Sequence, residues 1–246
     1  TRDPLWSRGL GDVYKRQILN SKSDTTIVNC TDAGWWFQEQ SYIPWYNPYV
    51  LSWRKAKLNV LSWRTPLTAP FAFGFEQSPK ETAEEQLKLI KKNFPKTKKI
   101  IYFGQCLGSS KTISTAIEAN ADQLYTTSTF FDPRLHRSKN LLELTKYESV
   151  DAIHTMKEAD KLPNTTFLYK EGDAEERSEH GRFVYSIGNN DNIQHYVVKY
   201  LDVWAPVLSN KPYGIFNILD KELPNTTVDM NFDEDPKLRK KIDTHG

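Results

Sequence analysis

The residues best suited to chemistry in this sequence surround Cys106, one of two cysteines. An apolar run enters GQCLG at 104–108, and apolar residues then recur at helical spacing, which predicts a strand, a sharp turn and a helix. The tip of such a turn raises its side chain on a strained backbone, so the neighbours two positions away must be small. Gly104 and Gly108 meet that demand. We therefore predict Cys106 as a nucleophile and the backbone N–H of Leu107 as a donor to an oxyanion.

The pattern Gly-x-Cys-x-Gly at 104–108 resembles the nucleophile elbow of the α/β-hydrolase superfamily in its cysteine form. It is similar to the elbow of dienelactone hydrolases and polyhydroxyalkanoate synthases, where lipases and esterases have Gly-x-Ser-x-Gly. The short segment SWRTP at 62–66 looks like part of the polyhydroxyalkanoate synthases as well. The resemblance implies a mostly parallel central sheet between two layers of helices. It also implies cleavage or transfer of an ester or thioester acyl group.

Two other interpretations of this segment stay open. Cys106 is a buried cysteine without chemistry in one of them, because free cysteine is among the most buried residue types. In the other, Ser110, Lys111 and Thr112 belong to a phosphate-binding loop between a strand and a helix. That loop would need glycine at 105 and 110, where the chain has Gln105 and Ser110, so it is the weaker alternative.

The resemblance implies a second oxyanion donor after an earlier strand. Residues 25–30, TTIVNC, predict that strand, and TDAGWW follows at 31–36. Only Gly34 and Trp35 match the H-G-G-G-W sequence of many hydrolases, but a backbone donor needs no particular side chain. We expect the N–H of Ala33 or Gly34 to complete the oxyanion hole. An ordinary strand-to-helix turn is the alternative.

The resemblance also implies an acid at the carboxyl end of a later strand. Residues 165–169, TTFLY, predict such a strand, and Glu171, Gly172 and Asp173 follow it. Asp173 is the predicted acid, with Glu171 and Asp132 as alternatives. A simple turn is equally open, because Gly-Asp pairs are routine turn residues.

The base of such a site must be a histidine that follows the acid in the chain. Of the five histidines, His180, His195 and His245 qualify, and His245 stands in a charged tail. His195 is the predicted base because it follows the turn-forming segment 188–192. Residues 193–204 themselves predict a last strand, which would put His195 at its start instead of beyond its end. A site without a working base is therefore a second prediction.

The clearest helix signal begins at Ser78. Ser78 as N-cap, Pro79 at the first helical position and Glu81 three residues after the cap form a capping box before an apolar stripe. Strands are predicted on either side of this helix at 58–63, 100–103 and 123–131. Alternating strands and helices indicate an α/β protein with a parallel sheet and helices on both faces.

One domain is expected, at 18–210, with a small helical cap inserted at about 134–162. Residues 1–17 lack any periodicity and look like a translated adaptor segment outside the fold. Residues 211–246 form a polar tail by composition.

Composition excludes several classes of protein. With 33 basic and 31 acidic residues the formal charge is +2, so overall charge gives no reason to expect nucleic acid or a membrane surface as a partner. No run approaches the ~18 apolar residues of a membrane span. Two cysteines, Cys30 and Cys106, and the lack of an apolar N-terminal segment predict the cytoplasm.

The predicted function is hydrolysis or acyl transfer on a small-molecule ester or thioester, with no cofactor and no metal. One alternative is an inactive hydrolase-fold protein that binds a lipid-like ligand or a protein partner. A nucleotide-binding protein is the less favoured alternative. The substrate and the oligomeric state are not predicted.

Overall fold

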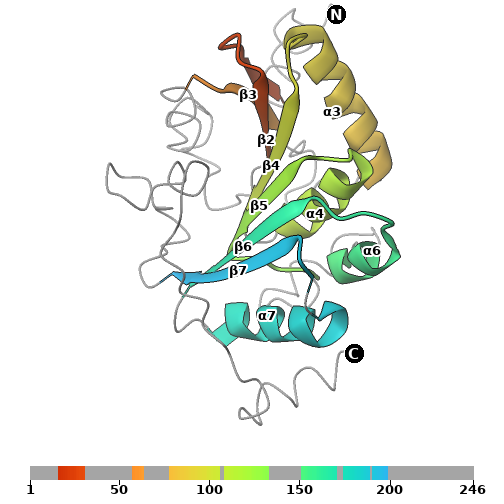
Figure 1. Ribbon diagram of the computed structural model, residues 1–246, viewed down its shortest axis with the longest axis vertical. Coiled ribbons are helices and arrows are strands. Elements are labelled where there is room, and N and C mark those ends of the chain that lie inside the picture. The colour runs from red at the N-terminus through yellow and green to blue at the C-terminus, as the bar shows by residue number, and fades with distance from the viewer. Residues whose placement is uncertain are drawn as a thin grey trace, which may run out of the picture.

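The protein is built around a seven-stranded sheet with the order β1-β3-β2-β4-β5-β6-β7 (Figure 1). The computed structural model describes residues 16–30, 57–63, 78–105, 108–132, 151–170, 174–188 and 190–198. An antiparallel pair at one edge joins β1 (Arg16–Leu19) to β3 (Asn59–Trp63). All other neighbours are parallel, and they are β2 (Thr25–Cys30), β4 (Lys99–Gln105), β5 (Gln123–Thr127), β6 (Asn164–Lys170) and β7 (Ile193–Val198). This architecture confirms the predicted fold class.

The described helices form one layer against the sheet (Figure 1). They are α3 (Pro79–Asn93), α4 (Ser109–Glu118), α6 (Ala152–Glu158) and α7 (Ala174–Ile187), each packed on the next. In chain order from β3 to β7, each parallel strand lies farther along the sheet in the same direction than the strand before it. Because crossovers between parallel strands are right-handed, their helices must share a face.

The step from β2 to β3 runs in the opposite direction. β2 and β4 are therefore neighbouring strands whose outgoing connections diverge. Open α/β sheets bind ligands at such a point, outside the carboxyl ends of the strands. The end of β4 is also where the predicted elbow begins.

The core lies between the sheet and this helix layer. It contains the fully buried side chains of Tyr102, Leu124 and Phe167 from the strands, with Ile113 from α4 and Phe183 from α7. Residues on the opposite face, among them Ile27 and Phe103, are buried as well. Both faces of the sheet are therefore covered, as a parallel sheet requires.

The start of α3 confirms the predicted capping box. The Ser78 hydroxyl accepts a hydrogen bond from the N–H of Glu81 (3.2 Å), and the Glu81 carboxylate accepts one from the N–H of Ser78 (2.9 Å). These bonds to Ser78 lower the pKa of Glu81. The helix ends at Asn93, and the buried Phe94 follows it.

Two boundaries differ from the sequence-based expectation. Arg16 and Gln17, expected in the adaptor segment, pair with Trp63 and Ser62 as half of β1. Four residues are too short to show a period, and their place depends on the backbone partners that β3 offers. The strand expected at 123–131 stops at Thr127, because Ser128 turns the chain with a φ of 50°.

The expected cap region also differs. α6 packs in the helix layer against α4 and α7, so residues 152–158 cover the sheet. The remainder of the cap prediction, before residue 151, and the polar tail lie outside the described residues. None of the helices in the described part of the chain is long and apolar enough to cross a membrane.

Candidate functional site

Several predicted site residues lie outside the described part of the chain: Cys106, Leu107, Ala33, Gly34, Asp173 and the alternative acid Glu171. The structure describes the residues on both sides of Cys106. β4 ends at Gln105, and Gly108 is the N-cap of α4. Strand and helix thus stand where the elbow pattern predicts them, with two residues between.

Gly104 is required by the approach of α4 to the strand. A Cβ atom at this position would lie 2.7 Å from both Cβ and Oγ1 of Thr112. Real Cβ atoms do not come so close, so only glycine fits beneath this helix. Gly108 has φ −70° and ψ −14°, which any residue adopts, so its backbone does not require glycine.

Cys30 lies beside this contact, at the end of β2, and pairs in register with Gly104. Burial is the main cause that raises the pKa of its thiol to about 11, against smaller opposing effects of Thr112, Lys111 and Gln86. Cys30 is therefore a neutral thiol near pH 7 and a poor nucleophile.

A buried polar network supports the same corner. The Gln86 amide of α3 donates to the sulfur of Cys30 (3.9 Å), and the Tyr102 hydroxyl of β4 donates to Gln86 (2.7 Å). Gln86 and Tyr102 are both fully buried. Sequence reasoning missed these two residues, although a glutamine within the apolar stripe of α3 was a visible signal.

The phosphate-loop alternative requires the hydroxyl of Thr112 to face a ligand. That hydroxyl instead donates to the carbonyl of Gly108 (2.8 Å), and the side chain packs against Gly104. Ser110 is fully buried. Thr112 thus packs α4 against β4 and does not present its hydroxyl to a ligand.

The segment after β5 is fixed from both neighbouring helices. Ser109 at the start of α4 accepts a hydrogen bond from the N–H of Phe130 (3.1 Å), and Glu179 of α7 accepts one from the N–H of Phe131 (2.9 Å). Asp132 follows and is 3% exposed. This alternative acid is therefore a buried carboxyl one strand away from β4.

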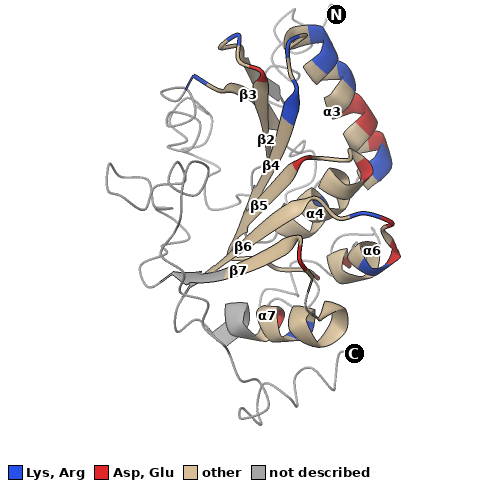
Figure 2. Cartoon of the chain, in the orientation of Figure 1, with Lys and Arg blue, Asp and Glu red and all other residues tan. Residues whose placement is uncertain are grey.

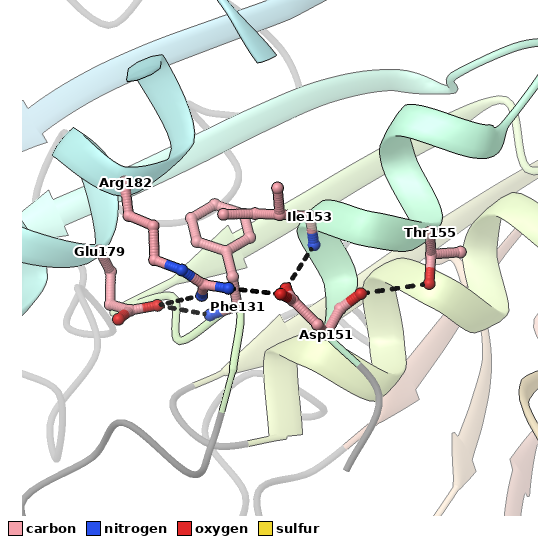
Figure 3. A network of polar contacts seen from close by, with 6 residues as sticks. All are labelled: Phe131, Asp151, Ile153, Thr155, Glu179 and Arg182. Carbon is pink, nitrogen blue, oxygen red and sulfur yellow. Dashed lines mark hydrogen bonds and ion pairs between the residues drawn. The ribbon is translucent and has the colours of Figure 1, made fainter. Parts of the chain in front are cut away.

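Arg182 holds Glu179 in place (Figure 3). Its guanidinium group lies 3.7 Å from the Glu179 carboxylate and also binds Asp151, which caps α6 through the N–H of Ile153 (3.0 Å). Phe131 accepts a hydrogen bond from the first residue of α6 (2.9 Å). Arg182 thus joins the segment after β5 to α6 and α7.

His195 lies far from the end of β4. It pairs with Phe167 of β6, Phe167 pairs with Thr126 of β5, and Thr126 pairs with Gly104. Three steps across a sheet are about 14 Å, at ~4.8 Å per strand. The structure therefore does not bring His195 to the end of β4, and an imidazole at this distance cannot take a proton from a group there.

The ring of His195 is part of an aromatic cluster between β6, β7 and α7. Its centroid lies 5.3 Å from that of Phe167, 5.0 Å from that of Phe183 and 4.4 Å from that of His180. Tyr169 stacks on His180 at 4.4 Å. The strand start expected for His195 is confirmed, and at that position its ring packs against other aromatic rings.

Both histidines of this cluster are held neutral. Burial lowers the pKa of His180 to about 3, with a smaller contribution from His195, and burial lowers the pKa of His195 to about 4. The third described histidine, His154, is exposed on α6, 3.2 Å from Glu158. Across the described ranges, no group of three or more His, Cys, Asp or Glu residues could hold a metal ion.

Known proteins resemble this chain in fold, while no family model and no curated protein matches its sequence. An esterase of Pyrococcus furiosus aligns with a TM-score of 0.54 and 15% identity over 76% of this chain and 77% of its own. An α/β serine hydrolase homologue of Coxiella burnetii gives 0.52 and 10% over 77% and 83%. A carboxylesterase structure from Nitrososphaera gargenis gives 0.52 and 10% over 83% and 91%. At these identities the likeness concerns architecture, and the chain has the fold of the α/β hydrolases.

Proposed function

We propose that the protein cleaves ester or thioester bonds through an acyl intermediate on Cys106. The observation that carries this proposal is the contact between Gly104 and Thr112, which leaves no room for a side chain beneath the start of α4. A nucleophile elbow needs this close approach of helix to strand, at the carboxyl end of a central strand. The esterases named above share the fold, which supports the same class of reaction.

In the proposed reaction the Cys106 thiolate attacks the carbonyl carbon of the substrate. A sulfur–carbon bond forms while the carbonyl π electrons move to oxygen. The N–H groups of Leu107 and of Ala33 or Gly34 stabilise this oxyanion. Collapse expels the alcohol or thiol, which takes up one proton from water and so balances the proton that Cys106 released to water when it ionised.

Water, or another acceptor, then attacks the acyl-cysteine and releases the acyl group. A cysteine suits this chemistry because part of it is ionised near neutral pH, provided that the thiol stays reduced. We therefore keep the cytoplasm as the proposed compartment. Asp173 is the proposed acid that orients the base.

The sequence predicts His195 as the base of this reaction. To reach Cys106, His195 would have to leave its contacts with Phe167, Phe183 and His180. This favours a second candidate function, in which the protein keeps the hydrolase fold without turnover. Such a protein would bind a lipid-like ligand or a protein partner.

The deciding experiment treats the full chain with an activated thioester and locates the acyl group by mass spectrometry. The hydrolase proposal expects acylation at Cys106, abolished by Cys106→Ala and unchanged by Cys30→Ser, together with turnover by the wild type. Equal labelling of wild type and Cys106→Ala would remove the nucleophile assignment. Acylation without turnover would favour the binding protein.

A further inference from the structure

Seven lysines gather at the amino end of the sheet, around the end of α3 and the turns that enter β2, β3 and β4 (Figure 2). We call these residues the lysine surface: Lys22, Lys57, Lys91, Lys92, Lys96, Lys98 and Lys99. All are exposed except the half-buried Lys99. The segments 20–24, 57–58 and 91–99 contain one acidic residue, Asp24, which leaves a formal charge of +6.

The charge is confined to one half of this end of the sheet. The turns that enter β5, β6 and β7 contain Asp122, Asp160 and Asp191, with Lys161 as the single lysine among their described residues. The nearly balanced charge of the whole chain therefore conceals a strongly uneven distribution. Within the described part of the chain, no member of the lysine surface forms an ion pair.

Hydrogen bonds join these segments into one fixed surface. The side-chain amide of Asn20 donates to the carbonyl of Asn93 at the end of α3 (2.6 Å). The N–H groups of Lys98 and Lys99 both donate to the carbonyl of Asp24 (2.7 and 3.1 Å). The lysines from separate elements are thus held side by side by the backbone that carries them.

Two of the lysines occupy backbone positions that disfavour lysine. Lys22 has a φ of 59° and Lys57 a φ of 57°, in the left-handed region where glycine or asparagine is preferred. The Asn59 side chain fixes the first of these turns by accepting the N–H groups of Ser21 and Ser23 (3.0 and 3.3 Å). Folding gives no reason for a lysine at either position, so what each adds there is an exposed charge.

The side-chain types of the lysine surface fit some anionic partners better than others. The lysine surface contains lysines and no arginine. Lysine carries a point charge and lacks the planar guanidinium group that forms bidentate hydrogen bonds with bases or phosphates. No aromatic side chain is exposed in the segments of the lysine surface, so stacking on bases is not available. The large exposed apolar side chains of the described residues are Ile18 and Tyr185, which lie outside these segments.

Clusters of four to eight basic residues are attracted to the negatively charged surface of acidic phospholipids. We propose that the lysine surface docks the protein on an anionic phospholipid membrane by charge alone, without insertion. This site is separate from the proposed catalytic site. The lysines lie at the amino ends of β2, β3 and β4, whereas Cys106 follows the carboxyl end of β4 in the sequence. Docking would leave the carboxyl ends of the strands facing away from the membrane.

The experiment measures sedimentation of the full chain with phosphatidylcholine vesicles and with vesicles that also contain phosphatidylserine. One variant removes three charges from the lysine surface, Lys91→Gln/Lys92→Gln/Lys96→Gln. Its matched control removes three exposed charges elsewhere, Lys80→Gln/Lys157→Gln/Lys161→Gln. Thermal unfolding of each variant verifies that it is folded.

The proposal expects binding to phosphatidylserine vesicles alone, weakened by salt as the Debye length shortens. The lysine-surface variant should bind more weakly by a factor of about 30 to 100, since each lysine near such a surface contributes to affinity. The control variant should stay within about threefold of the wild type. Equal binding to both vesicles, equal loss in the control, or tighter binding to RNA or DNA oligonucleotides would each overturn the proposal.

Discussion

One row of paired residues crosses the sheet from Cys30 through Gly104, Thr126 and Phe167 to His195, and its two ends serve different purposes. Cys30 and Gly104 lie at the point where the strand order reverses, under the start of α4. His195 lies in an aromatic cluster under α7. Both ends contain residues of catalytic type, and the first of them lies beneath the start of α4.

The difference shows that residue type is weaker evidence for chemistry than position in the sheet. At the Cys30 end, burial raises the pKa of a thiol and leaves it unreactive, while the neighbouring strand β4 ends at Gln105, directly before Cys106 in the sequence. At the other end, burial lowers the pKa values of His180 and His195 and leaves two neutral rings that pack like phenyl groups.

The largest effect is expected from Gly104→Ala. The new Cβ would lie 2.7 Å from Thr112, so α4 must move away from β4. We expect a loss of about 3 kcal/mol in the free energy of unfolding, the upper part of the range for overpacked cores. Urea unfolding measures the loss, and acyl labelling of Cys106 should fall with it.

The matched control for this prediction is Gly108→Ala. Gly108 has a helical backbone, which alanine adopts without backbone strain while lowering the entropy of the unfolded chain. Its free energy of unfolding should change by less than about 1 kcal/mol. Equal losses in the two variants would show that the close approach at Gly104 is not what the fold depends on.

The second effect concerns the contacts that hold α7 over the segment after β5. Arg182→Met removes the cation beside Glu179, whose side chain is 6% exposed. We expect a loss of about 2 kcal/mol, because a buried carboxylate loses the cation that lies beside it. Chemical denaturation of Arg182→Met, Glu179→Gln and the double variant measures the coupling. The loss from Arg182→Met should shrink when residue 179 is already neutral, and strictly additive losses would exclude the interaction.

Local signals predicted the parts of the fold that depend on neighbouring residues. The capping box at Ser78 predicted α3, and the run from 25 to 30 predicted β2 with its observed bounds. Gly104 was predicted to be small because it lies two residues before the tip of the turn. The structure confirms that no side chain fits there and shows what occupies the space, Thr112 of the following helix.

The place of His195 could not be predicted in the same way. Chain order selected it, but its distance from β4 depends on strand order, which no local pattern encodes. The helix α7 was not predicted at all, because its polar residues obscure the apolar face that packs on the sheet. Without α7 there was no signal that His180 would pack against His195.

The third effect follows from the depressed pKa values of these two histidines. A group whose pKa is lowered on folding contributes stability above its unfolded pKa, near 6.5, and loses it as the pH falls toward the folded value. With folded pKa values of about 3 and about 4, the loss for His180 and His195 runs from pH 6.5 down to about pH 3.

Denaturation at pH 7.5 and pH 5 measures this loss. We expect on the order of 1–2 kcal/mol for each histidine by pH 5, because each pH unit below the unfolded pKa costs ~1.4 kcal/mol at most. His195→Phe should reduce the loss, while the exposed His154→Gln should leave it unchanged. A wild-type stability independent of pH across this interval would show that the two rings are not held neutral.

The smallest effect on turnover is expected from His195→Phe, although the sequence alone predicted a large one. If His195 were the general base, its loss would lower turnover by at least ~10², the usual contribution of such a group. His195→Phe keeps an aromatic ring among Phe167, Phe183 and His180, so the fold under α7 should survive. Since the ring lies three strands from the end of β4, turnover of an activated thioester should stay within about threefold of the wild type. A hundredfold loss in a variant with an unchanged melting temperature would mean that β7 moves during the reaction, and it would restore His195 as the base.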